Sequence, residues 1–155
     1  IIAIDNSKAM IKECEKRYNK LNSIKFLHED IMDSELKEAS FIVINYVIQF
    51  LNLEQRTSLL NKTYKALLPG GALILSEKIH HKNKFESRRI FYTHHKFKSS
   101  QGYSDLEISG KRDSLEGILL TELEQDHIER AQEVGFKTSE IILSNLNFRT
   151  FKFTK

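Results

Sequence analysis

The sequence is poor in residues that several classes of protein depend on. Among 155 residues there is one cysteine, Cys14, one proline, Pro69, and no tryptophan. A single cysteine cannot form an internal disulfide, so a disulfide-stabilised secreted scaffold is excluded and a reducing, cytoplasmic environment is expected. Six glycines beside one proline also exclude a collagen-like or low-complexity chain.

Long hydrophobic runs are absent as well. The longest, residues 41–51, is interrupted by Asn45 and Gln49, and it falls short of the roughly 20 residues that a membrane helix needs. No basic start followed by an apolar stretch and a cleavage site is present, so we predict neither a signal peptide nor a membrane partner. A content of 40% hydrophobic and 29% charged residues is typical of a globular domain.

Acidic residues are scarce in one segment of a chain whose net charge is only +3. Between Lys78 and Lys98 there are seven Lys or Arg residues and four His, against the single acid Glu86. Two interpretations stay open, a solvated surface helix and a face that binds anions. The aromatic residues interleaved with these charges also suit RNA, but at this spacing they are more typical of the buried side of a helix, and no direct contact with nucleic acid is expected.

Strands and helices are predicted to alternate along most of the chain. Apolar, β-branched stretches predict strands at 1–5, 24–30, 41–47 and 72–78, and apolar periodicity predicts helices at 7–20, 54–67 and 123–134. This order indicates a doubly wound, mostly parallel α/β sheet. Residues 139–155 predict a closing hairpin of two edge strands. In the first helix, we expect Met10, Cys14 and Tyr18, with Ile11 beside them, to form the buried stripe.

The region from about 80 to 122 breaks the alternation. It is polar and rich in His and Lys, and we interpret it as an inserted helical cap. No internal repeat or second domain is predicted, so residues 1–155 are expected to form one domain. The chain starts with a buried strand and with Ile1 rather than Met, and we expect that a preceding strand and a glycine-rich loop are missing from it.

Each of the first three predicted strands ends at a pair that begins with a polar residue. The pairs are Asp5–Asn6, Asp30–Ile31 and Asn45–Tyr46. In open α/β sheets, ligands bind at the carboxyl ends of the strands. An acid after the first strand suits a ribose diol, and an acid beside an apolar residue suits an adenine. Each acid alone is as typical of a helix cap. The three in this order, followed by the LLPGG sequence at 67–71, predict a site for a nucleoside-type ligand.

This combination resembles the class I S-adenosylmethionine-dependent methyltransferases, which have a Rossmann-like fold. The resemblance implies that the glycine loop for the methionine moiety lies just before Ile1. The chain resembles the carboxy-S-adenosylmethionine synthase family more closely and over nearly its whole length. The stretches that carry this resemblance are IIAIDNSKAMI (1–11), NYVIQFL (45–51), LLPGGALILSEK (67–78), HHKFK (94–98), GYSDLEISGKR (102–112), LLTE (119–122) and GF (135–136).

The family resemblance implies an unusual reaction. A carboxylate passes from prephenate to the methyl carbon of S-adenosylmethionine, giving carboxy-S-adenosylmethionine and phenylpyruvate, and the product serves the modification of tRNA wobble uridine by a separate enzyme. It also implies a homodimer. No metal ion is expected, because the adjacent His94 and His95 would not face the same way on a helix and no Cys or Glu-x-x-His partner is evident. Carried over by position, Asp5 and Asn6 hold the ribose and Asp30 and Ile31 the adenine, while Asn45 and Arg112 act at the reacting end.

The chemistry of a carboxylate independently favours a basic pocket. A methyl group in transfer needs no cationic partner, whereas prephenate and a carboxylated sulfonium need fixed positive charge, and the planar fork of Arg pairs bidentately with a carboxylate. The candidate substrate pocket comprises Tyr46, His94, His95, Tyr103 and Lys111, beside Arg112. The alternatives to a role in substrate binding are an exposed salt bridge for Arg112 and packing roles for the histidines.

Two other functions remain open. An ordinary methyltransferase acting on a small molecule or on tRNA would share every cofactor residue, so replacement of Arg112 discriminates it from the synthase. A non-catalytic nucleoside-binding module would agree with the missing glycine loop, but the three intact strand ends argue against a decayed site.

Overall fold

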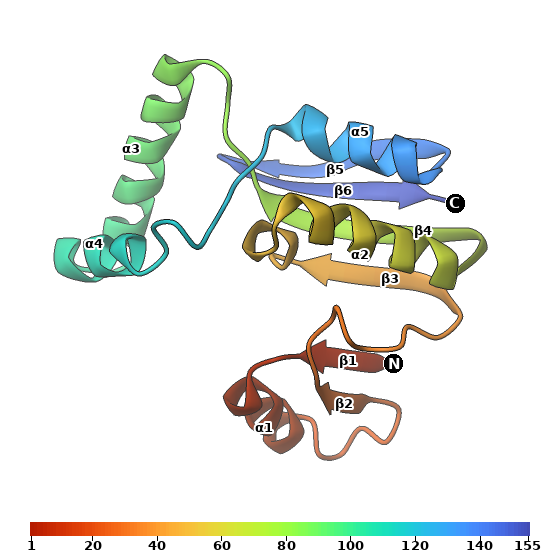
Figure 1. Cartoon of the computed structure of the whole chain (residues 1–155). Coiled ribbons are helices and arrows are strands. Elements are labelled where there is room, and N and C mark those ends of the chain that lie inside the picture. The colour runs from red at the N-terminus through yellow and green to blue at the C-terminus, as the bar shows by residue number, and fades with distance from the viewer. The chain divides into compact units, whose positions relative to one another are not determined.

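The computed structural model describes residues 1–155, which form two compact units, Ile1–Lys37 and Glu38–Lys155 (Figure 1). The first unit contains strand β1 (Ile2–Asp5), helix α1 (Lys8–Arg17) and strand β2 (Lys25–His28). The two strands are parallel, as predicted. The side chain of Ser7 accepts a hydrogen bond from the backbone N–H of Met10 and so caps the start of α1.

The predicted buried stripe of α1 is wrong for two of its members. Met10 is 53% exposed and Tyr18 is 41% exposed, while Cys14 is only half-buried. Ile11 is the one buried residue of the helix. The strands of this unit have only four residues each, and their short surface covers little of a ten-residue helix.

The second unit is built on a four-stranded sheet in the order β3-β4-β6-β5. β3 and β4 are parallel, whereas β6 is antiparallel to both of its neighbours. Helices α2 and α5 lie over one face of this sheet (Figure 1). The bounds of the elements are β3 Ala39–Asn45, the 3-10 turn η1 Ile48–Phe50, α2 Leu53–Ala66, β4 Leu67–Lys78, α3 Lys84–Ser100, α4 Asp105–Asp113, α5 Glu124–Val134, β5 Thr138–Asn145 and β6 Phe148–Thr154.

The C-terminal hairpin forms as predicted, but only one of its strands is an edge. β5 lies at the edge, and β6 is inserted between β5 and β4. Phe151 and Phe153 on β6 are fully buried, as are Leu73 and Leu75 on β4. Burying both phenylalanines under the helices favours the inner position for this strand.

The proline and glycines at 68–71 form an irregularity within β4 and not a separate loop before it. Ala39 pairs with Leu67 and Phe41 pairs with Ala72, so the intervening residues bulge out of the register. A Cβ atom at Gly71 would lie 2.8 Å from the backbone oxygen of Leu68 and 3.0 Å from that of Ser40. The close approach of backbone therefore requires glycine at this position.

The predicted insert contains helices α3 and α4, and we call residues 84–113 the helical arm. The arm extends from the sheet (Figure 1), and α3 has no buried residue. The two ends of the insert meet where Ile79 pairs with Glu122 and the N–H of His80 donates to the backbone oxygen of Glu122 at 3.0 Å. No helix in the structure is long and apolar enough to cross a membrane.

Candidate functional site

The carboxylate of Asp5 has one oxygen engaged within the protein and one without a protein partner. Oδ1 accepts a hydrogen bond from the backbone N–H of Ser7 at 2.7 Å, which holds the turn before α1, whereas the cap of that helix is Ser7 and not Asp5. Oδ2 forms no hydrogen bond, and the residue is exposed at the end of β1. The backbone oxygen of Asn6 contacts Nε2 of His28 at 3.1 Å. The strand end is thus ordered and still presents an acceptor for a ligand hydroxyl.

Asp30 repeats this arrangement after β2. Its Oδ1 accepts from the backbone N–H of Met32 at 2.8 Å, and its backbone oxygen accepts from the hydroxyl of Ser34 at 2.8 Å. Oδ2 forms no hydrogen bond, and Asp30 is exposed beside the half-buried Ile31. An acceptor next to an apolar side chain is the arrangement that an adenine ring requires.

Asn45 and Tyr46 form the end of β3 in the second unit. Asn45 is exposed and pairs with Ser76 in the parallel ladder. Tyr46 has a φ of +57°, in the left-handed region, and its N–H donates to the backbone oxygen of Ser76 at 2.8 Å. A non-glycine residue in this region is uncommon and costs about 1–2 kcal/mol, so the surrounding structure must hold this turn.

Glu77 holds the turn that follows Tyr46. Its Oε1 accepts hydrogen bonds from the backbone N–H groups of Val47, at 3.1 Å, and of Ile48, at 2.9 Å. Its Oε2 accepts from the N–H of Gln49 at 3.3 Å. The side chain is fully buried, and burial raises the pKa of Glu77 to about 7 against the lowering by these three N–H groups. Sequence reasoning missed this residue, although a charge at an inward-facing position of β4 was a detectable sign.

A buried ion cluster fixes the returning end of the insert. The carboxylate of Glu122 pairs with the guanidinium of Arg56 at 2.6 Å and with that of Arg130. Burial raises the pKa of Glu122, but the hydrogen bonds and charges of both arginines outweigh it and hold the pKa below its usual value. Arg56 also donates to the backbone oxygens of Leu51 and Leu120, each at 2.8 Å. The sequence analysis did not identify this cluster.

Phe148 connects two of the predicted pocket residues. Its ring makes edge-to-face contacts with Tyr46, at 5.9 Å between centroids, and with His94, at 5.4 Å. Phe148 is also the ladder partner of Lys78 at the end of β4. The strand-end turn and helix α3 are therefore joined through one aromatic ring that sequence reasoning did not single out.

A cavity of about 630 Å³ lies between the end of β4 and the helical arm. This volume suits a small organic ligand. Of the predicted pocket residues, His94, His95 and Lys111 line the cavity together with Arg112. Tyr46 and Tyr103 are not among the lining residues. Tyr103 lies in the turn between α3 and α4, and its side chain is 57% exposed.

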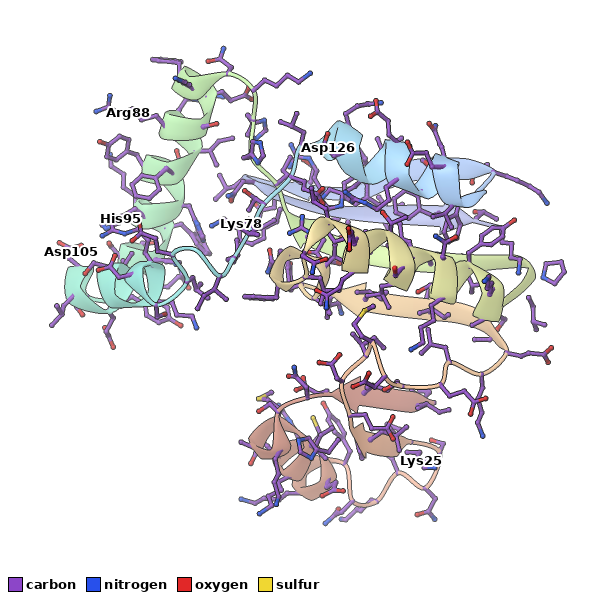
Figure 2. All side chains as sticks on the ribbon, in the orientation of Figure 1. Lys25, Lys78, Arg88, His95, Asp105 and Asp126 are labelled. Carbon is purple, nitrogen blue, oxygen red and sulfur yellow. The ribbon has the colours of Figure 1, made fainter.

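Arg112 forms an exposed salt bridge within α4, the non-functional alternative considered for it in the sequence. Its Nε and Nη2 atoms each lie 2.9 Å from Oδ1 of Asp113, and the side chain is 59% exposed. A ligand carboxylate would have to displace that of Asp113. His95 on α3 lies 3.7 Å from Asp105 at the start of α4, and Figure 2 shows these two side chains close together.

Comparison with known sequences identifies homologues over nearly the whole chain. A methyltransferase-domain family matches residues 1–71. Carboxy-S-adenosyl-L-methionine synthase of Yersinia enterocolitica is 40% identical over 151 residues, which are 96% of this chain and 57% of that protein. The synthase of Ruthia magnifica is 40% identical over 156 residues, covering 100% of this chain and 66% of its own length. The chain thus spans about three fifths of the length of the curated relatives it matches.

Solved structures agree on the fold. Human N-acetylserotonin methyltransferase in complex with S-adenosylmethionine aligns with a TM-score of 0.67 and 16% identity, covering 100% of this chain and 40% of that one. The N-methyltransferase NodS of Bradyrhizobium japonicum aligns with a TM-score of 0.64 and 17% identity, covering 99% of this chain and 65% of that one. The chain is therefore a homologue of the carboxy-S-adenosyl-L-methionine synthases, built on the class I S-adenosylmethionine-dependent methyltransferase fold.

Proposed function

We propose that the protein transfers a carboxylate from prephenate to the methyl carbon of S-adenosylmethionine, forming carboxy-S-adenosylmethionine and phenylpyruvate. The observation that carries the proposal is the cavity beside the end of β4, which is lined by four Lys or Arg side chains, Lys78, Lys98, Lys111 and Arg112, against two carboxylates. A methyl group in transfer is neutral and needs no such charge, whereas a dianionic carboxylate donor does. The names of the curated relatives support the same activity.

The proposed reaction balances without a further reactant. The bond between the prephenate ring and its carboxylate breaks, and hydroxide leaves the ring as it becomes aromatic. The methyl group of S-adenosylmethionine loses a proton, and its carbon forms a bond to the released carboxyl carbon. The proton and the hydroxide leave as water, so no oxidant or reductant is required.

The proposal assigns the nucleoside to the strand ends of the first unit, Ile1–Lys37. Asp5 and Asn6 take the ribose, and Asp30 with Ile31 takes the adenine. The Oδ2 atom of each aspartate supports this assignment, because the strand end keeps an acceptor while Oδ1 is hydrogen-bonded to the backbone.

At the reacting end, the proposal assigns Asn45 and Arg112. Arg112 pairs with the new carboxylate once Asp113 has been displaced. The substrate pocket takes His94, His95 and Lys111 from the cavity lining. Tyr46 acts from the adjoining turn through Phe148.

The oligomeric state and the location of the protein are also part of the proposal. We propose a homodimer in the cytoplasm, supported by apolar side chains that the helical arm leaves exposed: Phe85 at 78%, Phe97 at 55% and Leu106 at 83%. Exposed apolar surface of this extent is typical of an interface. The product serves tRNA wobble uridine modification elsewhere, without direct contact between this protein and nucleic acid.

Substitution of Arg112 tests the proposed function. In the full-length protein, Arg112→Met should lower carboxy-S-adenosylmethionine formation at least 100-fold, because a carboxylate loses its bidentate partner. S-adenosylmethionine affinity should change less than tenfold. Arg88→Met, on the exposed side of α3, is the matched control. Methyl transfer to an acceptor that survives Arg112→Met would favour an ordinary methyltransferase.

A further inference from the structure

Three basic groups near the end of β4 share the cavity without a counter-ion. Lys78, His94 and Lys98 all line it, and Figure 2 shows Lys78 on the side of the sheet that faces the helical arm. Neither lysine forms a side-chain hydrogen bond or ion pair in the structure. The ring of His94 packs edge-to-face on that of Phe148.

These groups lie close enough to repel one another. Burial, and after it the charge of Lys98, lowers the pKa of Lys78. Burial lowers the pKa of His94 too, and Lys98 and Lys78 lower it further. Half-buried charges of like sign destabilise a protein unless an anion compensates them. The cluster is thus suited to bind an anion.

The acids of the cavity do not neutralise this cluster. Asp113 is paired with Arg112. Glu116 lies in the turn after α4 and lines the cavity together with Lys111, a positive charge from α4 itself. The charge of the cavity therefore remains positive at the end of β4.

The rest of the lining indicates what kind of anion fits. Phe91, Ile108, Leu115 and Leu119 give the cavity an apolar wall, which suits a ring and not an inorganic ion. The register of β3 and β4 also shows how far the cluster lies from Asn45, which the proposal assigns to the reacting end. Ser76 pairs with Asn45, and Lys78 lies two residues further along β4, about 7 Å beyond that pair.

We propose that Lys78, His94 and Lys98 form a carboxylate subsite for a six-membered-ring keto acid, separate from Arg112. The inference rests on the proposed function and deepens it. Prephenate carries two carboxylates, of which one is transferred and one stays on the phenylpyruvate product. Arg112 pairs with the transferred group, and the subsite on β4 and α3 holds the retained one while the ring packs on the apolar wall.

Calorimetric titration of phenylpyruvate into the complete gene product tests the subsite without requiring turnover. Lys78→Met and Lys98→Met should each weaken binding about tenfold, because each removes a charge-assisted contact. Lys78→Arg should retain most of the affinity. Lys96→Met is the matched control, since Lys96 is exposed on the same helix and does not line the cavity. Methyl phenylpyruvate, which lacks the carboxylate, should bind all variants equally weakly.

Kinetics separate failure of the subsite from failure of the proposed function. With prephenate and S-adenosylmethionine, the two Met variants should raise KM for prephenate about tenfold and leave KM for S-adenosylmethionine unchanged. If the wild type forms product while Lys78→Met and Lys98→Met behave like Lys96→Met in both assays, the subsite is overturned. If the wild type forms no carboxy-S-adenosylmethionine but the binding pattern holds, the subsite stands and the proposed function fails.

Discussion

At the scale of single residues, His127 on α5 makes stability depend on pH. The side chain is 2% exposed, and neither ring nitrogen has a hydrogen-bond partner. Burial lowers the pKa of His127 to about 4 from a usual value of 6.5. Between these values the unfolded chain binds a proton that the folded protein rejects, so stability falls as the pH drops below 6.5.

Replacing His127 with Phe should remove this dependence. Because the ring already packs against that of Phe151, at 5.3 Å between centroids, an aromatic substitute keeps the contact. Relative to wild type, the variant should gain up to about 2 kcal/mol on going from pH 8 to pH 5. Urea unfolding at both pH values measures the difference, with His80→Gln at an exposed site as control. Parallel pH profiles for wild type and variant would refute the interpretation.

Glu77 acts on the candidate site through the turn that it holds. Glu77→Gln would replace one carboxylate oxygen by an NH₂ group facing backbone N–H donors, so the free energy of unfolding should fall by about 1–3 kcal/mol. Glu140→Gln is the control, because Glu140 is exposed on β5 and pairs only with Lys152. Denaturant titration of both variants measures the change in the free energy of unfolding. Equal small decreases for the two variants would show that the three hydrogen bonds contribute little.

The sequence allowed prediction of residues at strand ends better than of buried charges. The ends of parallel strands meet at one edge of a sheet, which is why Asp5 and Asp30 were identified as candidates. Glu77 depends on backbone partners about 30 residues away in sequence, and Glu122 depends on Arg56, on a separate helix, as well as on Arg130, eight residues further along the chain. No local pattern reports such pairs, because the register that brings them together is set by tertiary packing.

At the scale of elements, the Glu122 cluster connects the insert with α2 and α5. Glu122→Gln would leave the buried guanidinium groups of Arg56 and Arg130 without a full counter-charge. Breaking a buried pair in this way costs about 3–5 kcal/mol, which guanidinium unfolding will detect. Glu140→Gln, at an exposed pair, should cost less than about 1 kcal/mol. A loss as small for Glu122→Gln would show that the cluster contributes little to stability.

Gly70 and Gly71, at the start of β4, disfavour a side chain for different reasons. Gly70 has a φ of +75° with open space around its missing side chain, so Gly70→Ala should cost about 1–2 kcal/mol of backbone strain. Gly71→Ala should cost more, because its Cβ would approach two backbone oxygens. Thermal unfolding ranks the two variants. A smaller loss for Gly71→Ala would mean that the bulge relaxes easily.

The type of each helix and strand was predicted more reliably than the position of each strand in the sheet. Apolar, β-branched stretches identified the strands, because they depend on local geometry, and the polar composition of residues 80–122 identified the helical insert. The inner position of β6 was not predictable, since either strand of a hairpin satisfies the same pattern. The exposed Met10 and Tyr18 likewise show that an amphipathic stripe does not specify how much of it a short sheet covers.

At the scale of the whole molecule, the helical arm and the end of β4 combine basic side chains around a cavity with exposed apolar side chains. The fold itself is shared with methyltransferases at 16–17% identity, so it does not determine the reaction. The features that bear on the proposed substrate are the cationic cavity between the end of β4 and the helical arm and the similarity to the curated synthases.

Mass spectrometry of the complete gene product incubated with S-adenosylmethionine and prephenate tests the central claim most directly. The account predicts a nucleoside heavier than S-adenosylmethionine by one carboxyl group, formed together with an equal amount of phenylpyruvate. Unchanged S-adenosylmethionine, or S-adenosylhomocysteine alone, would contradict it.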